Sequence, residues 1–141
     1  MTADFRLHEQ LSADTITLGT SALCDIRLMN DATWPWVLLV PRRLGVREIY
    51  ELGAADQAQL WRESSALGEG MMRVFGGDKL NVAALGNMVP QLHLHHIVRY
   101  VGDPAWPAPV WGKQPAVPYE ARALERRLQD LEPVLAELRR L

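Results

Sequence analysis

The segment GNMVPQLHLHHIVRY, residues 86–100, decides more about this chain than any other stretch. Gln91, His93 and His95 occupy alternating positions in it, with leucines between them. Because successive side chains of a β-strand point to opposite faces, a strand here would carry the three polar groups in one row and turn the leucines toward a core. Imidazole is the common side chain for nucleophilic attack or proton transfer near neutral pH. The segment therefore predicts a functional strand.

The other histidines of the chain fit less well with chemistry. His96 falls on the face of the leucines, so we expect a packed or interface histidine there rather than a catalytic one. His8 has no supporting context. For His93 and His95 the structural alternative is a cross-strand pair or an exposed polar face.

Composition sets the class of protein. The chain has 141 residues, 48% hydrophobic and 23% charged, which suits one globular domain with a real core. A formal net charge of −2 lacks the basic excess typical of nucleic-acid binding. Cys24 is the one cysteine, so no intrachain disulfide and no Cys-rich zinc site is expected. The sequence starts without a signal-peptide pattern, and its apolar runs fall short of the roughly 20 residues that span a bilayer. We expect a cytoplasmic protein that binds neither membranes nor nucleic acid.

Hydrophobic periodicity predicts the order of elements. Alternating or continuous short apolar runs predict strands, and the region 54–75 switches to helical spacing before a Gly-Gly pair. A Pro- and Trp-rich segment follows the histidines, and then a leucine-rich helix that Pro133 should kink or break. Neighbouring strands with hairpin-length connections favour an antiparallel α+β fold. The predicted strands are 15–19, 23–29, 36–40, 79–85 and the histidine segment; a turn-like link lies at 48–52, the main helix at 54–75, a covering loop at 101–118 and the terminal helix from about Tyr119.

Three segments together resemble the histidine triad (HIT) superfamily. QLHLHHIV at 91–98 is similar to its histidine strand, LMNDATWPWVLLVPRR at 28–43 to its nucleotide-pocket strand and turn, and KLNVAALGNMVPQLHLH at 79–95 to its phosphate-binding segment. The resemblance covers roughly residues 5 to 112. It implies a HIT-like antiparallel sheet with one main helix and a C-terminal helix. The expected division is a catalytic domain at 1–114 and a helical extension at 115–141, packed on that domain or on a dimer partner.

The resemblance also implies a mechanism. His93 would attack the α-phosphate of a nucleotide, and water would then release a nucleoside monophosphate from the nucleotidyl-histidine. His95 would hydrogen-bond the phosphate oxygens. Gln91 stands where most members have the first histidine, as in a bacterial branch of the superfamily, and would donate an amide N–H without titrating. Plausible substrates are dinucleoside polyphosphates or nucleoside phosphoramidates, and no cofactor is expected.

Further positions match the family's binding residues, each with a structural alternative. For Asn87 the alternative is a role in the turn it shares with Gly86, and for the two apolar positions it is a place in the core. Trp106 and Trp111 are expected to cap the core rather than to close a partner's site. The matched positions are Asn81, Asn87 and Gly86 for phosphate, Asn30 for the ribose hydroxyls, and Phe5 and Leu28 for the base. Solvated surface roles are expected for Arg42, Arg43 and Arg99, and the alternative is that they steer a polyphosphate.

Two other functions compete with this one. His-x-His on a strand can offer two zinc ligands, but a catalytic zinc site needs a third protein ligand from a distant Asp or Glu, since the chain has no cysteine cluster and no HExxH motif. We predict no metal. A non-catalytic nucleotide sensor is the other alternative, and Gln91 keeps it open.

The helices suggest assembly. Apolar residues on the 54–75 helix extend beyond one narrow stripe, and leucines recur through 124–138. Exposed apolar surface of that size usually marks a partner, and a two-fold homodimer is the commonest closed assembly. The alternative is that the terminal helix folds back on its own sheet.

Overall fold

The fold is built on one antiparallel sheet. The computed structural model describes residues 5–141, and its five strands lie in the order β1-β2-β3-β5-β4. The predicted α+β class is confirmed. The elements are α1 (Glu9–Asp14), β1 (Thr15–Thr20), β2 (Cys24–Met29), β3 (Trp36–Pro41), the 3-10 helix η1 (Ile49–Glu51), α2 (Ala54–Phe75), β4 (Lys79–Ala83), β5 (Leu94–Arg99) and α3 (Ala121–Arg139).

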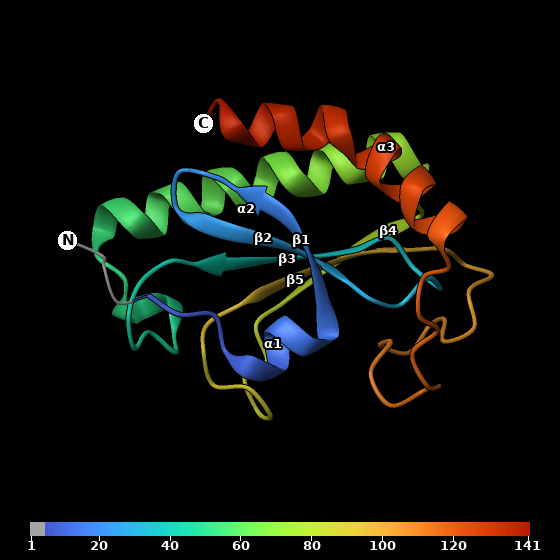
Figure 1. Cartoon of the computed structure of the whole chain (residues 1–141), viewed down its shortest axis with the longest axis horizontal. Coiled ribbons are helices and arrows are strands. Elements are labelled where there is room, and N and C mark those ends of the chain that lie inside the picture. The colour runs from blue at the N-terminus through green and yellow to red at the C-terminus, as the bar shows by residue number, and fades with distance from the viewer. Residues whose placement is uncertain (1–4) are drawn as a thin grey trace.

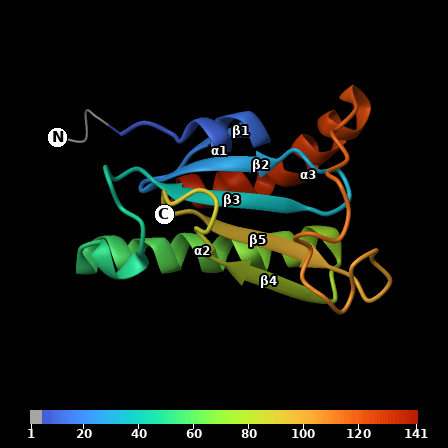
Figure 2. The same cartoon turned by 90° about the horizontal axis from the view of Figure 1, so that it is seen from below.

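The two faces of the sheet are covered differently. Helices α2 and α3 lie together over one face, while α1 and the long loops lie on the other (Figure 1). Figure 2 shows the strand order across the sheet, with β3 in the middle and β4 at an edge. All six residues of β3 are buried, as its continuous apolar run predicts for a central strand. Alternate residues of β3 belong to two hydrophobic clusters, one on each face: Val37 and Leu39 on the helix face, Trp36, Leu38 and Val40 on the other.

Helix α2 begins and ends where the sequence predicts. It runs from Ala54 to Phe75, and Gly76 closes it in the left-handed conformation at φ 59° with its N–H donating to the carbonyl of Met72. Glycine meets this backbone conformation without the steric cost that a side chain would add. The predicted strand at 79–85 is shorter than expected, since β4 ends at Ala83.

Helix α3 corrects one prediction. Pro133 does not break it, because the helix runs from Ala121 through Arg139 with the proline inside, and Figure 1 shows it bent rather than straight. Its leucine face packs on the chain's own core, where Leu131, Leu135 and Leu138 are buried. The leucine series therefore supplies no surface for a partner, and the fold-back alternative describes this helix.

The helix face leaves no room for larger side chains at the α2–α3 contact. A Cβ added to Gly70 would lie 2.9 Å from Cγ1 of Val134, inside van der Waals contact. Two helices can approach this closely because the glycine has no side chain. Among residues 5–141, no helix is long and apolar enough to cross a bilayer.

Candidate active site

His93 and His95 lie together on the face of the sheet opposite the helices. His95 is in β5, while His93 stands just before the strand, which begins at Leu94. The two rings meet edge to face with centroids 4.9 Å apart. Both are buried, with exposed fractions of 7% for His93 and 5% for His95. The predicted pairing of these side chains on one face is what the structure contains, although the strand itself is shorter than predicted.

The hydrogen bond of His93 sets its tautomer. Nδ1 lies 2.7 Å from the backbone carbonyl oxygen of Gln91. A carbonyl oxygen only accepts, so Nδ1 carries the proton and donates, and Nε2 holds an unshared electron pair. Burial lowers the pKa of His93 below its usual 6.5, with a smaller contribution from His8. The neutral, nucleophilic form is therefore the one favoured at neutral pH.

His95 has the opposite arrangement. The indole Nε1–H of Trp36 donates to its Nδ1 at 3.0 Å. Because an indole N–H is only a donor, Nδ1 of His95 is the acceptor and the proton sits on Nε2. Burial lowers the pKa of His95 to about 3, helped by the neighbouring His93 and His96. His95 is thus a neutral hydrogen-bond donor.

His96 points to the helix face, as its position in the alternation predicts. It is fully buried, and its Nε2 lies 2.7 Å from the hydroxyl of Ser64 on α2. Burial lowers its pKa to about 4. The side chain packs between sheet and helix, away from His95.

Gln91 does not take the position expected for a phosphate donor. Its Oε1 accepts from the backbone N–H of His8 at 2.9 Å, and its Nε2 donates to the carbonyl of Arg6, also at 2.9 Å. Both ends of the amide are therefore used to hold the N-terminal segment. The part of Gln91 that serves the site is its main-chain carbonyl, which orients His93.

The expected phosphate-binding residues are spread along one side of the histidines. Gly86 adopts φ 73° and lines a small cavity together with His93 and the side chain of Arg47. Asn87 is exposed in the adjacent turn. Asn81 lies on the histidine face of β4, but its Oδ1 already accepts from Arg99 at 2.8 Å. Gly86 is thus beside His93, while Asn81 belongs to a neighbouring ion network.

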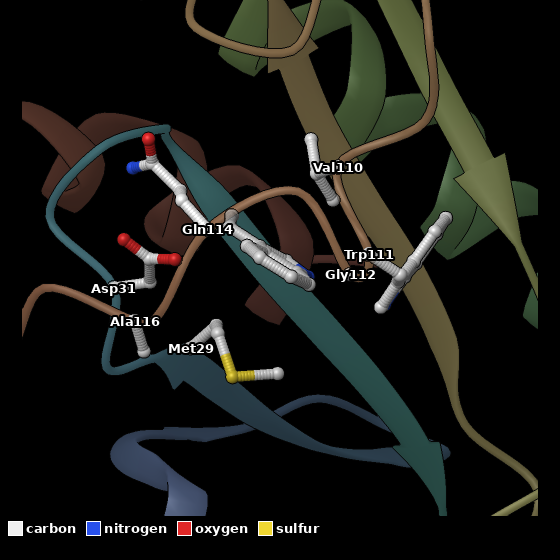
Figure 3. A pocket seen from close by; sticks show the side chains of 8 residues that line it. Met29, Asp31, Val110, Trp111, Gly112, Gln114 and Ala116 are labelled. Carbon is white, nitrogen blue, oxygen red and sulfur yellow. The ribbon is translucent and has the colours of Figure 1, made fainter.

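A larger cavity of about 180 Å³ opens beside Trp36 (Figure 3). Met29 and Asp31 line it from the end of β2, and the loop after the histidines supplies Trp111 and Gln114. Trp111 also meets the His95 ring edge to face, with centroids 5.0 Å apart. The cavity is therefore close to the histidines and is lined by both polar and aromatic groups.

The three residues expected to bind the nucleoside lie in different places. Phe5 packs against the cluster on the histidine face. Asn30 lies next to the cavity residue Asp31, and its Oδ1 accepts from the N–H of Tyr119 at 2.9 Å. Leu28 is fully buried on the helix face, paired across strands with Val37, so the assignment of Leu28 to a base pocket is wrong. Alternation along β2 turns its side chain away from the histidines.

The three arginines considered as surface cations have structural roles. Arg43 makes a two-pronged ion pair with Asp56, its Nε lying 2.7 Å from Oδ2. Arg42 donates to backbone carbonyls of residues 21 and 22. Arg99 is 1% exposed and pairs with Asp103 at 2.8 Å, so the expectation of a solvated Arg99 is wrong. A buried guanidinium without a charged partner is strongly destabilising. Here the loop that follows β5 supplies that partner, Asp103.

Residues important for the site escaped the sequence analysis. Trp36 reads as one apolar residue in a buried run, and Trp111 as a cap. Only the pairing of β3 with β5, in which Leu38 faces His95 and Trp36 faces Ile97, places the Trp36 indole on the histidine face. No three His, Cys, Asp or Glu side chains of residues 5–141 gather in a way that could hold a metal ion.

Comparison with known proteins agrees with this geometry. The HIT domain family profile matches residues 10–102, so the chain belongs to the histidine triad family. A histidine triad protein from Marinobacter aquaeolei VT8 is 67% identical, with a TM-score of 0.94 over 95% of this chain and 98% of that one. One from Sinorhizobium meliloti 1021 is 41% identical, with a TM-score of 0.91 over 98% and 100%.

A third histidine triad protein, from Bradyrhizobium japonicum, is 43% identical, with a TM-score of 0.89 over 92% of this chain and 96% of that one. No curated protein matches the chain. Membership of the family supports a nucleotide-binding or nucleotide hydrolase function.

Proposed function

We propose that the protein hydrolyses or transfers nucleotidyl groups at the α-phosphate through a covalent nucleotidyl-His93 intermediate. The observation that carries this is the opposed tautomers of the paired histidines. His93 presents an electron pair at Nε2 because Nδ1 donates to a carbonyl, and His95 presents an N–H at Nε2 because Nδ1 accepts from an indole. A nucleophile and a neutral donor side by side suit attack on phosphorus.

The reaction balances in two steps. In the first, Nε2 of His93 forms a bond to the α-phosphorus. The bond from that phosphorus to the leaving group breaks, and the leaving group departs with the electron pair. In the second, water attacks the same phosphorus, and the bond to Nε2 of His93 breaks with its electron pair returning to that nitrogen. The proton that the water loses is taken up by the departed leaving group or by solvent. Throughout, the Nε2–H of His95 donates to a non-bridging oxygen, where negative charge gathers. The product is a nucleoside monophosphate.

The nucleoside would occupy the cavity of about 180 Å³ beside Trp36. Aromatic and apolar walls suit a base, and the carboxylate of Asp31 together with Asn30 suits the ribose hydroxyls at the end of β2. The phosphates would then extend toward His93 and the turn at Gly86, where a backbone without a side chain allows close approach. Dinucleoside polyphosphates and nucleoside phosphoramidates both contain such a nucleoside with an α-phosphate.

Trapping the intermediate tests the proposal. Protein mixed with an α-³²P-labelled dinucleoside polyphosphate and quenched in alkali should retain label, because phosphoramidate bonds to histidine survive base and not acid. His93→Ala should retain none. His96→Gln, checked for folding by circular dichroism, is the matched control and should keep the label. Turnover that persists in His93→Ala would overturn the covalent mechanism, and nucleotide binding without turnover in the unaltered protein would favour a sensor.

We also propose a cytoplasmic homodimer. The support is the edge strand β4, which has no neighbouring strand on its outer side within the described chain and on which Val82 is 43% exposed. Edge strands readily pair with a second strand. Light scattering at micromolar concentration should give the mass of two chains, and Val82→Lys should shift it toward one. A single-chain mass for the unaltered protein would contradict the dimer.

A further inference from the structure

Trp36 makes and breaks no bond in the proposed reaction, yet it contacts the histidine that would donate to the phosphate. Its Nε1 donates to Nδ1 of His95 at 3.0 Å, and both side chains are buried, with exposed fractions of 6% and 5%. The hydrogen bond joins β3 to β5 through side chains rather than through the backbone ladder. It is the sole polar contact of the Trp36 indole in the described structure.

The chemical nature of the partner matters more than the distance. A carboxylate, a carbonyl or a hydroxyl could accept from His95 and would draw its proton to Nδ1. An indole cannot accept through its nitrogen, so it permits only the tautomer in which Nδ1 accepts and Nε2 carries the proton. The indole donates directly to Nδ1, so no bridging water takes part in this hydrogen bond.

The indole is itself held in place. Trp34 meets it edge to face at 6.2 Å between ring centroids, and Trp111 does the same at 5.9 Å. Its backbone lies at the start of the central strand, paired with Ile97 of β5. Rotation of the indole would break both aromatic contacts, so the donor direction is fixed before a substrate arrives.

We propose that Trp36 is a positioning residue that locks His95 as a neutral donor at Nε2 toward the phosphate. The inference rests on the proposed function. Because the lock is present in the free protein, the site pays no reorientation cost when charge develops on the phosphate oxygens. Trp36 also lines the nucleoside cavity, so one side chain contacts both halves of the proposed substrate site.

The first experiment needs no substrate. Long-range ¹H–¹⁵N correlation spectra of histidine-labelled protein near pH 7 distinguish the two neutral tautomers. The expected result for His95 is a proton on Nε2, and for His93 a proton on Nδ1. A proton on Nδ1 of His95 in the unaltered protein would overturn the proposal, even if the enzyme is active.

The second experiment removes the donor while keeping an aromatic ring. Trp36→Phe should lower kcat by about tenfold to a hundredfold, the size expected when a catalytic group loses its alignment. It should also abolish the single-tautomer signature of His95 and leave that of His93 unchanged. Trp106→Phe is the matched control, since the Trp106 ring lies over the Arg99 guanidinium at 5.7 Å rather than against Trp36 or His95, and it should change kcat by less than threefold.

A rescue variant separates the hydrogen bond from the packing. Trp36→His again offers a ring N–H, but its ring can also accept, so it should recover only part of the rate that Trp36→Phe loses and should leave His95 divided between two tautomers. Equal kcat values for Trp36→Phe and the unaltered protein would overturn the positioning role. If Trp36→Phe does not fold, the tautomer measurement on the unaltered protein still decides the proposal. Absence of trapped nucleotide with the predicted His95 tautomer present would instead reject the proposed function alone.

Discussion

His95 and His96 are neighbours on one strand, yet they belong to different parts of the molecule. His95 faces tryptophans and a cavity, and His96 faces α2 and the hydroxyl of Ser64. Burial lowers the pKa of both, to about 3 and about 4. The difference therefore lies in the partner: an indole fixes one tautomer of His95, whereas a hydroxyl, which both donates and accepts, bonds Nε2 of His96 without fixing its tautomer.

The same contrast holds for the two faces of the sheet. The helix face is a continuous apolar core with close helix contacts, as at Gly70. The histidine face carries Trp34, Trp36 and Trp111 with a cavity between the sheet and the loop. The helix face therefore supplies rigidity, and the loop-covered face carries the candidate site. Changes on the first should alter stability, and changes on the second should alter turnover.

The largest effect is expected for the nucleophile. His93→Ala should lower kcat by about a thousandfold or more, while nucleotide affinity stays within about tenfold, since the loss falls on the transition state. Steady-state kinetics and equilibrium binding of a nucleoside monophosphate measure the two quantities. A proportional loss of binding and turnover would mean that His93 binds rather than attacks.

Breaking the Arg99–Asp103 ion pair beneath the loop should alter stability rather than turnover, although the pair lies on the histidine face. Asp103→Ala removes the carboxylate that pairs with Arg99 at 2.8 Å, with side-chain exposures of 2% for Arg99 and 4% for Asp103. Leaving a buried guanidinium without its partner costs about 3–5 kcal/mol. Urea unfolding measures this loss of stability. The control is Arg139→Ala, which breaks the exposed ion pair with Glu132 and should cost less than about 1 kcal/mol. A small cost for Asp103→Ala would mean that the loop reopens to water.

On the helix face, Ser64→Ala should act on stability alone. It leaves Nε2 of His96 buried without its 2.7 Å partner, at an expected cost of about 1–3 kcal/mol in the free energy of unfolding. Turnover measured well below the unfolding midpoint should change by less than threefold. A kcat that falls as far as in Trp36→Phe would break the distinction between the two faces.

Gln91→Ala separates the main-chain role of this residue from its side chain. The variant keeps the carbonyl that orients His93 and loses the two bonds to Arg6 and His8. We expect a cost of about 1–2 kcal/mol and a kcat within tenfold. Hydrogen exchange at the His8 amide should become faster. A kcat loss matching that of His93→Ala would return the side chain to the chemistry.

A small step in acidity, from pH 7 to 6, should produce an effect on stability that both faces share. Since the folded-state pKa values of His95 and His96 lie below 6.5, the unfolded chain binds protons below that pH that the folded chain does not. Stability should therefore fall as pH drops through 6.5 and level off only near pH 3 to 4. Between pH 7 and 6 the two histidines together should cost about 1.4 kcal/mol. Urea midpoints measured at several pH values check this, and His96→Gln should show a shallower decline.

The site was only partly predictable because its parts come from distant segments. Alternation within one strand was enough to place His93 and His95 together and His96 on the other side. It could not reveal that the side-chain amide of Gln91 holds the N-terminal segment, because its partner His8 lies 83 residues away in the sequence. Leu28 matched a family position, but the phase of β2 against β3 turned it into the core.

By itself, the sequence determined the α+β class, the order of the main elements and the strand that carries the histidines, since periodicity and glycine or proline breaks are local properties. Tertiary structure alone decided which nitrogen of each histidine holds the proton. That choice depends on a carbonyl two residues away for His93 and on an indole 59 residues away for His95. The pairing of β3 with β5 brings that indole into contact, and no local pattern encodes the register of two strands so far apart in the chain.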